Sequence, residues 1–166
     1  MDKKSLYIIR HAKAELPTFG KDDFDRDLLS TGIGRAELIA QKLKTQLPAA
    51  DEKTLVISST ANRAMQTAKI FCGVLGYPEE RIVWEPKVYE AHYLFLMKRL
   101  NDIPSSYDRI LLFGHNPGVS DLVAYTTDHS VNLKTAHTAC LEVEEGIDYS
   151  TLSANTAILK QVITEY

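Results

Sequence analysis

The chain has 166 residues, of which 45% are hydrophobic and 25% charged, with 8 glycines and 6 prolines. This composition is typical of one soluble globular domain, and it excludes collagen-like, disordered and coiled-coil proteins. The formal net charge of -3 lacks the basic surplus expected of a nucleic-acid-binding domain.

A chain of this length buries roughly 70% of the surface that its unfolded form exposes, so it needs no structural metal or disulfide. Cys72 and Cys140 lie far apart, which fits neither a CxxC metal motif nor a dense disulfide framework. We expect two buried thiols in a reducing compartment. The apolar run over 6–9 is too short for a signal sequence or a membrane span, so a cytoplasmic location is expected, with no membrane partner.

The first predicted elements are a strand, a loop and a helix. Residues 6–9 form a continuous apolar run, which is typical of a strand covered on both faces. Residues 14–29 show no clear period and predict a surface loop. Apolar residues then follow helical spacing over 36–47, and Ser30 or Thr31 is the expected N-cap.

Strands and helices continue to alternate along the chain. An apolar, β-branched run over 55–57 predicts a second strand, and the helical pattern over 65–75 follows it. A weaker strand over 82–84 precedes a helical pattern over 93–100, and 110–113 repeats the apolar pattern of the first strand. Alternation of this kind predicts a mostly parallel sheet flanked by helices.

The last part of the chain predicts a short helix and two strands. Pro117 is placed to start a helix over 119–123. Residues 139–143 alternate with a period of two, as in a half-buried strand, and 156–163 can pair with them. No linker, repeat or low-complexity tract interrupts the sequence, so we expect a single domain over 1–166.

Chargeable residues follow three of the predicted strands: Arg10-His11, the segment 58–63 that ends in Arg63, and Gly114-His115-Asn116. The carboxyl ends of parallel strands form one sheet edge, where ligands bind. An arginine fork matches phosphate oxygens. An imidazole beside guanidinium groups tends to remain neutral and nucleophilic. The pattern therefore predicts transfer of a phosphoryl group to His11 and then to water.

These residues resemble the histidine phosphatase superfamily, also called the phosphoglycerate mutase-like family. The resemblance is closest to its SixA-type phosphohistidine phosphatases. The matching blocks are Ile9-Arg10-His11-Ala12, an RHG-type motif, and the segments 25–32, 58–68, 89–91 and 114–117. A lone Arg-His pair is weak evidence for the resemblance, but five blocks in the order and spacing of the family make the resemblance specific. The resemblance implies a three-layer α/β fold of the phosphoglycerate mutase type and catalysis without a cofactor or metal.

The same resemblance assigns the main catalytic roles. His11 is the phosphate acceptor. Arg10, Arg63 and His115 hold the phosphoryl oxygens and their growing charge. Glu90 matches the position of the acid that protonates the leaving group in many members, although some SixA-type relatives manage without it.

Two further residues are implied to bind substrate. Arg26 matches a family position in the anion pocket, and Asn116 is expected to shape the pocket beside His115. The sequence departs from the pattern at Ala12, where glycine is usual, and at Asp27, which adds a negative charge beside Arg26.

Several segments contain residue types that can also bind metal ions or act as serine nucleophiles. The chain has no HxxxH, HxH or clustered Cys pattern, and arginines repel a cation, so we expect no metal site. Asp22, Asp23 and Asp25 lack EF-hand spacing and are interpreted as a solvated loop. The run of hydroxyl residues over 58–60 lacks a GxSxG elbow and is interpreted as helix N-capping.

The distance from Arg63 to His115 in the sequence leaves room for a helix, a strand and a second helix, but not for the long helical cap of many small-molecule relatives. An uncapped site can admit a phosphorylated side chain of another protein. The resemblance therefore favours a phosphatase for phosphohistidine in a signalling or phosphotransfer protein. A small-molecule phosphomonoesterase or mutase is the first alternative, and a phosphate-binding module without turnover is the second.

Overall fold

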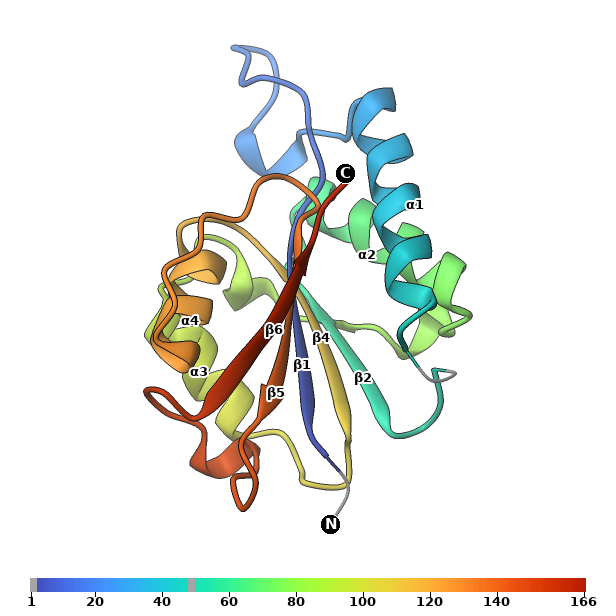
Figure 1. Ribbon diagram of the computed structural model, residues 1–166. Helices are drawn as coiled ribbons and strands as arrows, with labels where there is room; N and C mark the ends of the chain where they lie inside the picture. Colours follow the sequence, from blue (N-terminus) through green and yellow to red (C-terminus); the bar gives the residue numbers. More distant parts are fainter. Residues whose placement is uncertain (1–2, 48–49) are drawn as a thin grey trace.

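The computed structural model describes residues 3–47 and 50–166, and in this part a sheet is covered by helices on both faces (Figure 1). The strands are β1 (Ser5–Arg10), β2 (Thr54–Ser58), β3 (Val83–Trp84), β4 (Arg109–Gly114), β5 (Thr138–Val143) and β6 (Ala157–Ile163). The helices are α1 (Ser30–Lys44), α2 (Asn62–Leu75), α3 (Tyr93–Asn101) and α4 (Gly118–Thr127). Short 3-10 turns are η1 (Asp23–Asp25), η2 (Glu79–Arg81), η3 (Pro86–Val88) and η4 (Tyr149–Thr151).

The sheet order is β3-β2-β4-β1-β5-β6. Strands β3, β2, β4 and β1 pair in parallel, whereas β5 is antiparallel to both β1 and β6. All strands except β5 therefore run in the same direction, and the expected three-layer, mostly parallel α/β fold is confirmed. The predicted pairing of 156–163 with the strand before it is also confirmed, since β6 pairs with β5.

Two cores lie on the two faces of the sheet, because successive strand residues point to opposite sides. Figure 1 shows α1 and α2 on one face and α3 and α4 on the other. The core under α3 and α4 takes from the central strands Leu6, Ile8, Leu55, Ile57, Ile110 and Leu112. The core under α1 and α2 takes Ile9, Val56, Leu111 and Phe113. Burial on both faces explains the unbroken apolar runs in the sequence.

Helix α1 begins earlier than its apolar pattern predicts. It starts at Ser30, and its N-cap is Leu29, which makes no side-chain capping bond, so the prediction of Ser30 or Thr31 as the cap was wrong. Apolar periodicity misses the first turns because most of their side chains, such as Ser30, Thr31 and Ile33, face solvent. Gly32 is the exception, since a Cβ there would lie 2.1 Å from the Lys13 carbonyl oxygen. This close approach packs α1 directly on the segment that follows β1.

Strand β5 is more deeply buried than the predicted half-buried strand. Ala139, Leu141 and Val143 belong to one core, and Cys140 on the other face is only 6% exposed. The reason is that β5 lies inside the sheet, between β1 and β6. Both Cys72 and Cys140 are buried free thiols, as expected. None of the helices in the described part of the chain is long and apolar enough to span a membrane.

Candidate active site

Strand register brings the two candidate histidines together. The central strands β1 and β4 are parallel neighbours, with Arg10 opposite Gly114. The next residues, His11 and His115, therefore leave the same sheet edge side by side, and their ring centroids are 5.1 Å apart. The backbone N–H of His11 donates to the Gly114 carbonyl oxygen at 3.0 Å, which extends the β1–β4 pairing by one bond.

The His11 ring is oriented as a nucleophile. Its Nδ1 lies 2.8 Å from the Ala12 carbonyl oxygen, which can only accept, so we assign the proton to Nδ1. Nε2 then carries the free lone pair. Burial, with smaller contributions from Arg63 and Arg10, lowers the pKa of His11 from 6.5 to about 4, against the opposing effect of the bond to Ala12. His11 is therefore neutral at physiological pH, as the sequence predicts.

His115 is held by a serine. Its Nε2 lies 2.8 Å from Ser59 Oγ, while its Nδ1 is buried without a hydrogen-bond partner in the described part of the chain. Burial, together with His11 and Arg63, lowers the pKa of His115 to about 3. Since Ser59 Oγ already accepts from the Ala61 N–H at 3.2 Å, we assign its proton to the bond with His115. A neutral His115 then presents Nδ1–H as a donor.

Ser59 therefore does not have the capping role that the sequence suggested. The N-cap of α2 is Ala61, and no side-chain bond caps that helix. Ser59 follows the last residue of β2, and its N–H donates to the Phe113 carbonyl oxygen at 3.1 Å. This pairing places its hydroxyl beside His115. The interpretation as helix capping was wrong because a run of hydroxyl residues does not reveal which histidine lies on the neighbouring strand.

Arg10 and Asn116 share an anchor. Arg10 Nη1 donates to the Leu133 carbonyl oxygen at 3.1 Å, and Asn116 Nδ2 donates to the same oxygen at 2.8 Å. Asn116 Oδ1 accepts from Ser120 Oγ at 2.6 Å. The Asn116 amide is therefore bonded to Leu133, the same residue that holds the Arg10 guanidinium. Arg10 Nε is buried without a hydrogen-bond partner among the described residues.

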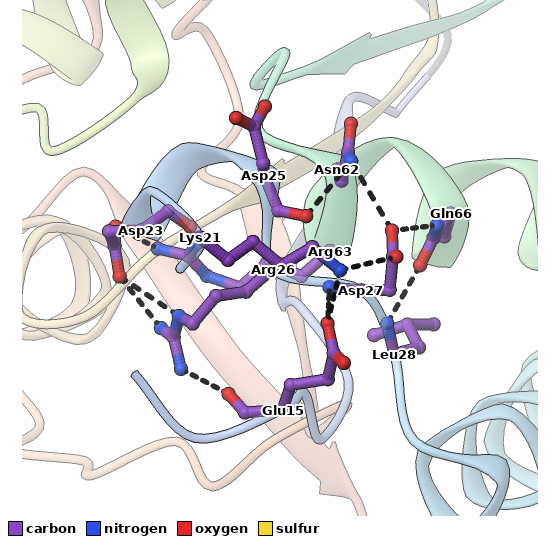
Figure 2. Close-up of polar contacts among 10 residues, drawn as sticks. All are labelled: Glu15, Lys21, Asp23, Asp25, Arg26, Asp27, Leu28, Asn62, Arg63 and Gln66. Atoms are coloured by element: carbon purple, nitrogen blue, oxygen red, sulfur yellow. Dashed lines mark hydrogen bonds and ion pairs between the residues drawn. The ribbon is translucent and has the colours of Figure 1, made fainter. Parts of the chain in front are cut away.

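Arg63 lies at the start of α2 and is almost fully buried, with 5% of its side chain exposed. Its Nη1 and Nη2 donate to the backbone oxygen and Oδ2 of Asp23, at 2.7 and 3.0 Å. Arg26 also contacts Asp23, through Nε at 3.0 Å from Oδ1, and donates from Nη1 to the Glu15 carbonyl oxygen at 2.6 Å (Figure 2). Arg26 is close enough to lower the pKa of His11.

The negative charge at Asp27 is directed away from the arginines. Its carboxylate accepts from Lys21 Nζ at 2.9 Å, from Gln66 Nε2 at 2.8 Å and from Asn62 Nδ2 at 3.2 Å (Figure 2). Lys21 also donates to Glu15 Oε1 at 2.7 Å. Asp27 thus fastens the loop to α2 through Asn62 and Gln66.

Ala12, the other departure from the family pattern, fits the structure. Its side chain is fully buried in the core under α1 and α2, so the added methyl group packs inward. Its N–H donates to Thr67 Oγ1 at 2.9 Å, and Thr67 in turn donates to the Arg63 carbonyl oxygen at 2.7 Å. Thr67 therefore links the backbone beside His11 to the helix that carries Arg63.

Glu90 lies at the rim of the site. It is exposed, adopts a left-handed backbone with φ of 56°, and makes no hydrogen bond or ion pair with the described residues. The ring of the preceding residue, Tyr89, packs edge-on against His115 at 5.4 Å, and the Arg63 guanidinium lies 5.8 Å from its centre. The role of Glu90 as the acid stays a prediction.

The assembled site has the chemistry of an anion pocket. Buried polar groups almost always have partners. Here Arg10 Nε, Arg63 Nε and His115 Nδ1 are buried donors without partners in the part of the chain that the structure describes. They belong to residues near His11, since the His115 ring lies 5.1 Å from the His11 ring and both arginines lower the pKa of His11. A phosphoryl group bound there would meet both its ligands and its nucleophile.

Sequence reasoning missed Asp23, Ser59 and Tyr89. Asp22, Asp23 and Asp25 lie in a solvent-accessible loop, as expected, but Asp23, with 41% of its side chain exposed, also binds Arg63, Arg26 and Tyr89. The available signal was the i, i+3 spacing of Asp23 and Arg26, which places an acid beside a candidate anion ligand. Tyr89 belongs to a matching motif block, but nothing in the sequence indicates which way its ring points.

Comparison with known proteins gives distant relatives in sequence. An uncharacterized chloroplastic protein of Arabidopsis thaliana is 29% identical over 149 residues, which cover 84% of this chain and 66% of the relative. An uncharacterized protein of Mycobacterium tuberculosis strain H37Rv is 32% identical over 114 residues, covering 69% of this chain and 66% of the relative. The chain thus spans about two thirds of the length of these relatives.

Solved structures with the same fold include a SixA-type protein from Nakamurella multipartitia, with a TM-score of 0.82, 21% identity, and coverage of 98% of this chain and 96% of that one. The protein histidine phosphatase SixA complexed with tungstate matches with a TM-score of 0.79 and 21% identity, covering 97% of each chain. The Plasmodium falciparum phosphoglycerate mutase has a TM-score of 0.67 and 14% identity, covering 97% of this chain and 91% of that one. The expected resemblance to the SixA and phosphoglycerate mutase fold is confirmed. Because a family model matches residues 6–116 as well, the chain belongs to the histidine phosphatase superfamily, branch 1.

Proposed function

We propose that this protein hydrolyses phosphohistidine on another protein, through a covalent phosphohistidine intermediate on His11. The observation that carries the proposal is the pairing of a neutral His11, whose Nε2 is free, with the buried, unpartnered donors of Arg10, Arg63 and His115. A nucleophile beside preorganised donors is the arrangement that stabilises the charge of a transferring phosphoryl group.

In the first step, His11 Nε2 attacks phosphorus and the bond from phosphorus to the substrate imidazole breaks. The released imidazole nitrogen takes up a proton from solvent, while His11 keeps its proton on Nδ1. In the second step, water attacks the phosphoryl group on His11, which yields inorganic phosphate and restores the neutral imidazole. Arg10, Arg63 and His115 hold the phosphoryl oxygens in both steps, so no cofactor is needed.

Two features support a protein as the substrate. Between Arg63 and His115 the chain forms only the rest of α2, the strands β3 and β4, helix α3 and short 3-10 turns, without a helical cap over the site. The loop that carries Arg26 presents Leu16 and Phe19 fully or almost fully to solvent. A folded phosphoprotein can cover these apolar side chains while its phosphorylated residue enters the pocket, whereas a small phosphoester cannot.

The test is a comparison of kcat/KM for three substrates: a phosphohistidine-bearing phosphotransfer domain, free phosphohistidine and an aryl phosphate. The proposal predicts that the domain is preferred and that a Leu16→Ser, Phe19→Ser double variant lowers kcat/KM for the domain alone. Preference for the aryl phosphate would favour the small-molecule alternative. Binding of phosphate without turnover of any substrate would favour the binding module.

Glu90→Gln adds an independent arm to this comparison. Phosphohistidine carries a good leaving group, whereas an ester oxygen needs a proton donor. The variant is expected to keep phosphohistidine hydrolysis within about threefold, and to slow ester hydrolysis by about 100-fold if Glu90 is the acid. An equal loss of rate on both substrates would contradict the argument that the imidazole leaving group needs no acid from the enzyme.

A further inference from the structure

One carboxylate, that of Asp23, fastens the loop after β1 to Arg63 at the candidate site. Asp23 Oδ2 accepts from Arg63 Nη2 at 3.0 Å, and its backbone oxygen accepts from Arg63 Nη1 at 2.7 Å. Asp23 Oδ1 accepts from Arg26 Nε at 3.0 Å and lies 2.9 Å from Arg26 Nη2. The Tyr89 hydroxyl donates to Asp23 Oδ2. Asp23 therefore holds two guanidinium groups and a phenol at once.

This arrangement leaves one edge of Arg63 free. A guanidinium group is a rigid planar fork, so fixing one edge fixes the direction of the others. Asp23 occupies the edge formed by Nη1 and Nη2. Nε is buried and has no partner among the described residues. The edge formed by Nε and Nη2 is thus the one that can grip two phosphoryl oxygens.

Arg26 acts differently from Arg63. Both Nε and Nη2 of Arg26 contact Asp23, and Nη1 donates to the Glu15 carbonyl oxygen. Figure 2 shows this guanidinium between Asp23 and Glu15. Its contacts brace Asp23 from the side opposite Arg63, so the carboxylate cannot rotate without breaking bonds to the loop.

Asp23 also supplies charge. Burial lowers the pKa of Arg10, and the positive charge of the nearby Arg63 lowers it as well. A nearly buried Arg63 needs a counter-ion before substrate arrives. The bond from Tyr89 and the two arginines lower the pKa of Asp23 to about 2, against the effect of burial. Asp23 is thus a carboxylate at working pH and cannot serve as the proton donor.

We propose that Asp23 is a positioning residue for phosphoryl transfer, which holds Arg63 by its Nη1–Nη2 edge so that the Nε–Nη2 edge faces the phosphoryl oxygens. This inference rests on the proposed function, because it takes a phosphoryl group as the ligand. For loss of the Asp23 charge, the proposal predicts weaker anion binding, whereas simple Coulomb attraction predicts tighter binding. Removing a negative charge beside an anion pocket should tighten anion binding, whereas losing the alignment of Arg63 should weaken it.

The test compares Asp23→Asn with Asp22→Asn. Asp22 is the neighbouring loop residue, is exposed, and makes no side-chain hydrogen bond with the described residues, so its variant changes the same charge in the same loop. Binding of inorganic tungstate, a tetrahedral oxyanion, is measured by calorimetry. Hydrolysis of the phosphohistidine domain and of an aryl phosphate is measured in parallel, with melting temperatures as a check on folding.

We expect Asp23→Asn to weaken tungstate binding about tenfold and to lower kcat by about 10- to 100-fold, with a smaller change in KM, as for a misaligned catalytic group. Asp22→Asn should stay within about twofold, and Asp23→Glu should recover part of the loss because it keeps the charge. Tighter tungstate binding by Asp23→Asn would overturn the proposal and identify the carboxylate as a competitor of the ligand. Equal binding by the two Asn variants would overturn it as well.

The calorimetric arm separates this inference from the proposed function. If the wild type binds tungstate but hydrolyses no phosphohistidine, the proposed function fails while the comparison of the Asp23 and Asp22 variants still decides the role of Asp23. If the wild type binds no oxyanion, both proposals are contradicted.

Discussion

The buried histidine pair should make the fold sensitive to mild acid. Burial and neighbouring charges lower the pKa of His11 to about 4 and that of His115 to about 3, from 6.5 in each case. At a pH between the folded-state pKa values and 6.5, both histidines are protonated in the unfolded chain and neutral in the folded protein. Stability is therefore highest at neutral pH, falls as the pH drops below 6.5, and levels off only below the folded-state pKa values.

The size of the effect follows from the shifts. Lowering the pH from about 7 to about 5 costs about 2 kcal/mol for each histidine, or about 4 kcal/mol for the pair, which is a large part of the stability of an ordinary domain. Urea unfolding at the two pH values measures it directly. Phosphate-free buffer is needed because a bound anion would favour the protonated rings.

Variants assign the effect to the site. His11→Gln and His115→Gln should each remove about half of the pH dependence. His129→Gln removes an exposed histidine whose ring contacts the Thr127 carbonyl oxygen and neither of the two site histidines, so it serves as the control and should leave the pH dependence unchanged. A wild type equally stable at both pH values would refute the argument that both rings are neutral in the folded protein.

Three further predictions concern the site and the core. Ser59→Ala should lower kcat about 10- to 100-fold under conditions where the variant is folded, because His115 Nε2 loses the donor 2.8 Å away that fixes its proton on Nδ1; unchanged steady-state kinetics would contradict this tautomer. The variant should also lower the melting temperature, because the Ala61 N–H and the buried His115 ring both lose a partner. Arg63→Lys should lower kcat/KM about 100- to 1,000-fold, since an ammonium cannot replace the fork, and activity close to wild type would show that charge alone suffices. Lys4→Met should cost about 2 kcal/mol in urea unfolding, because the buried Asp108 carboxylate loses the nearer of two ammonium partners, Lys4 at 3.1 Å, and keeps Lys53 at 3.7 Å; unchanged stability would argue against a structural ion pair there.

Much of the fold is predictable because both faces of the sheet are covered. Buried parallel strands require continuous apolar runs, which is why β1, β2 and β4 are evident in the sequence. The start of α1 is not, since its first turns face solvent and carry no apolar period. The near-complete burial of β5 depends on its place inside the sheet, which local alternation cannot reveal.

The candidate site divides in the same way. His11 and His115 are predictable because each follows an apolar strand within a family motif, and parallel pairing brings them together. Asp23 and Ser59 act through residues distant in the sequence, at Arg63 and His115. Whether an acid in a solvent-accessible loop also binds an arginine is decided by tertiary packing, which composition alone cannot reveal.

The central claim is that His11 carries the phosphoryl group during turnover. Rapid-quench labelling with a radioactive phosphohistidine-bearing domain tests it most directly, with His11→Ala as the matched variant. We predict that the wild type acquires an acid-labile, alkali-stable phosphoryl group on His11 before phosphate is released, and that His11→Ala does neither. Phosphate release by His11→Ala at the wild-type rate, or label on another residue, would contradict the account.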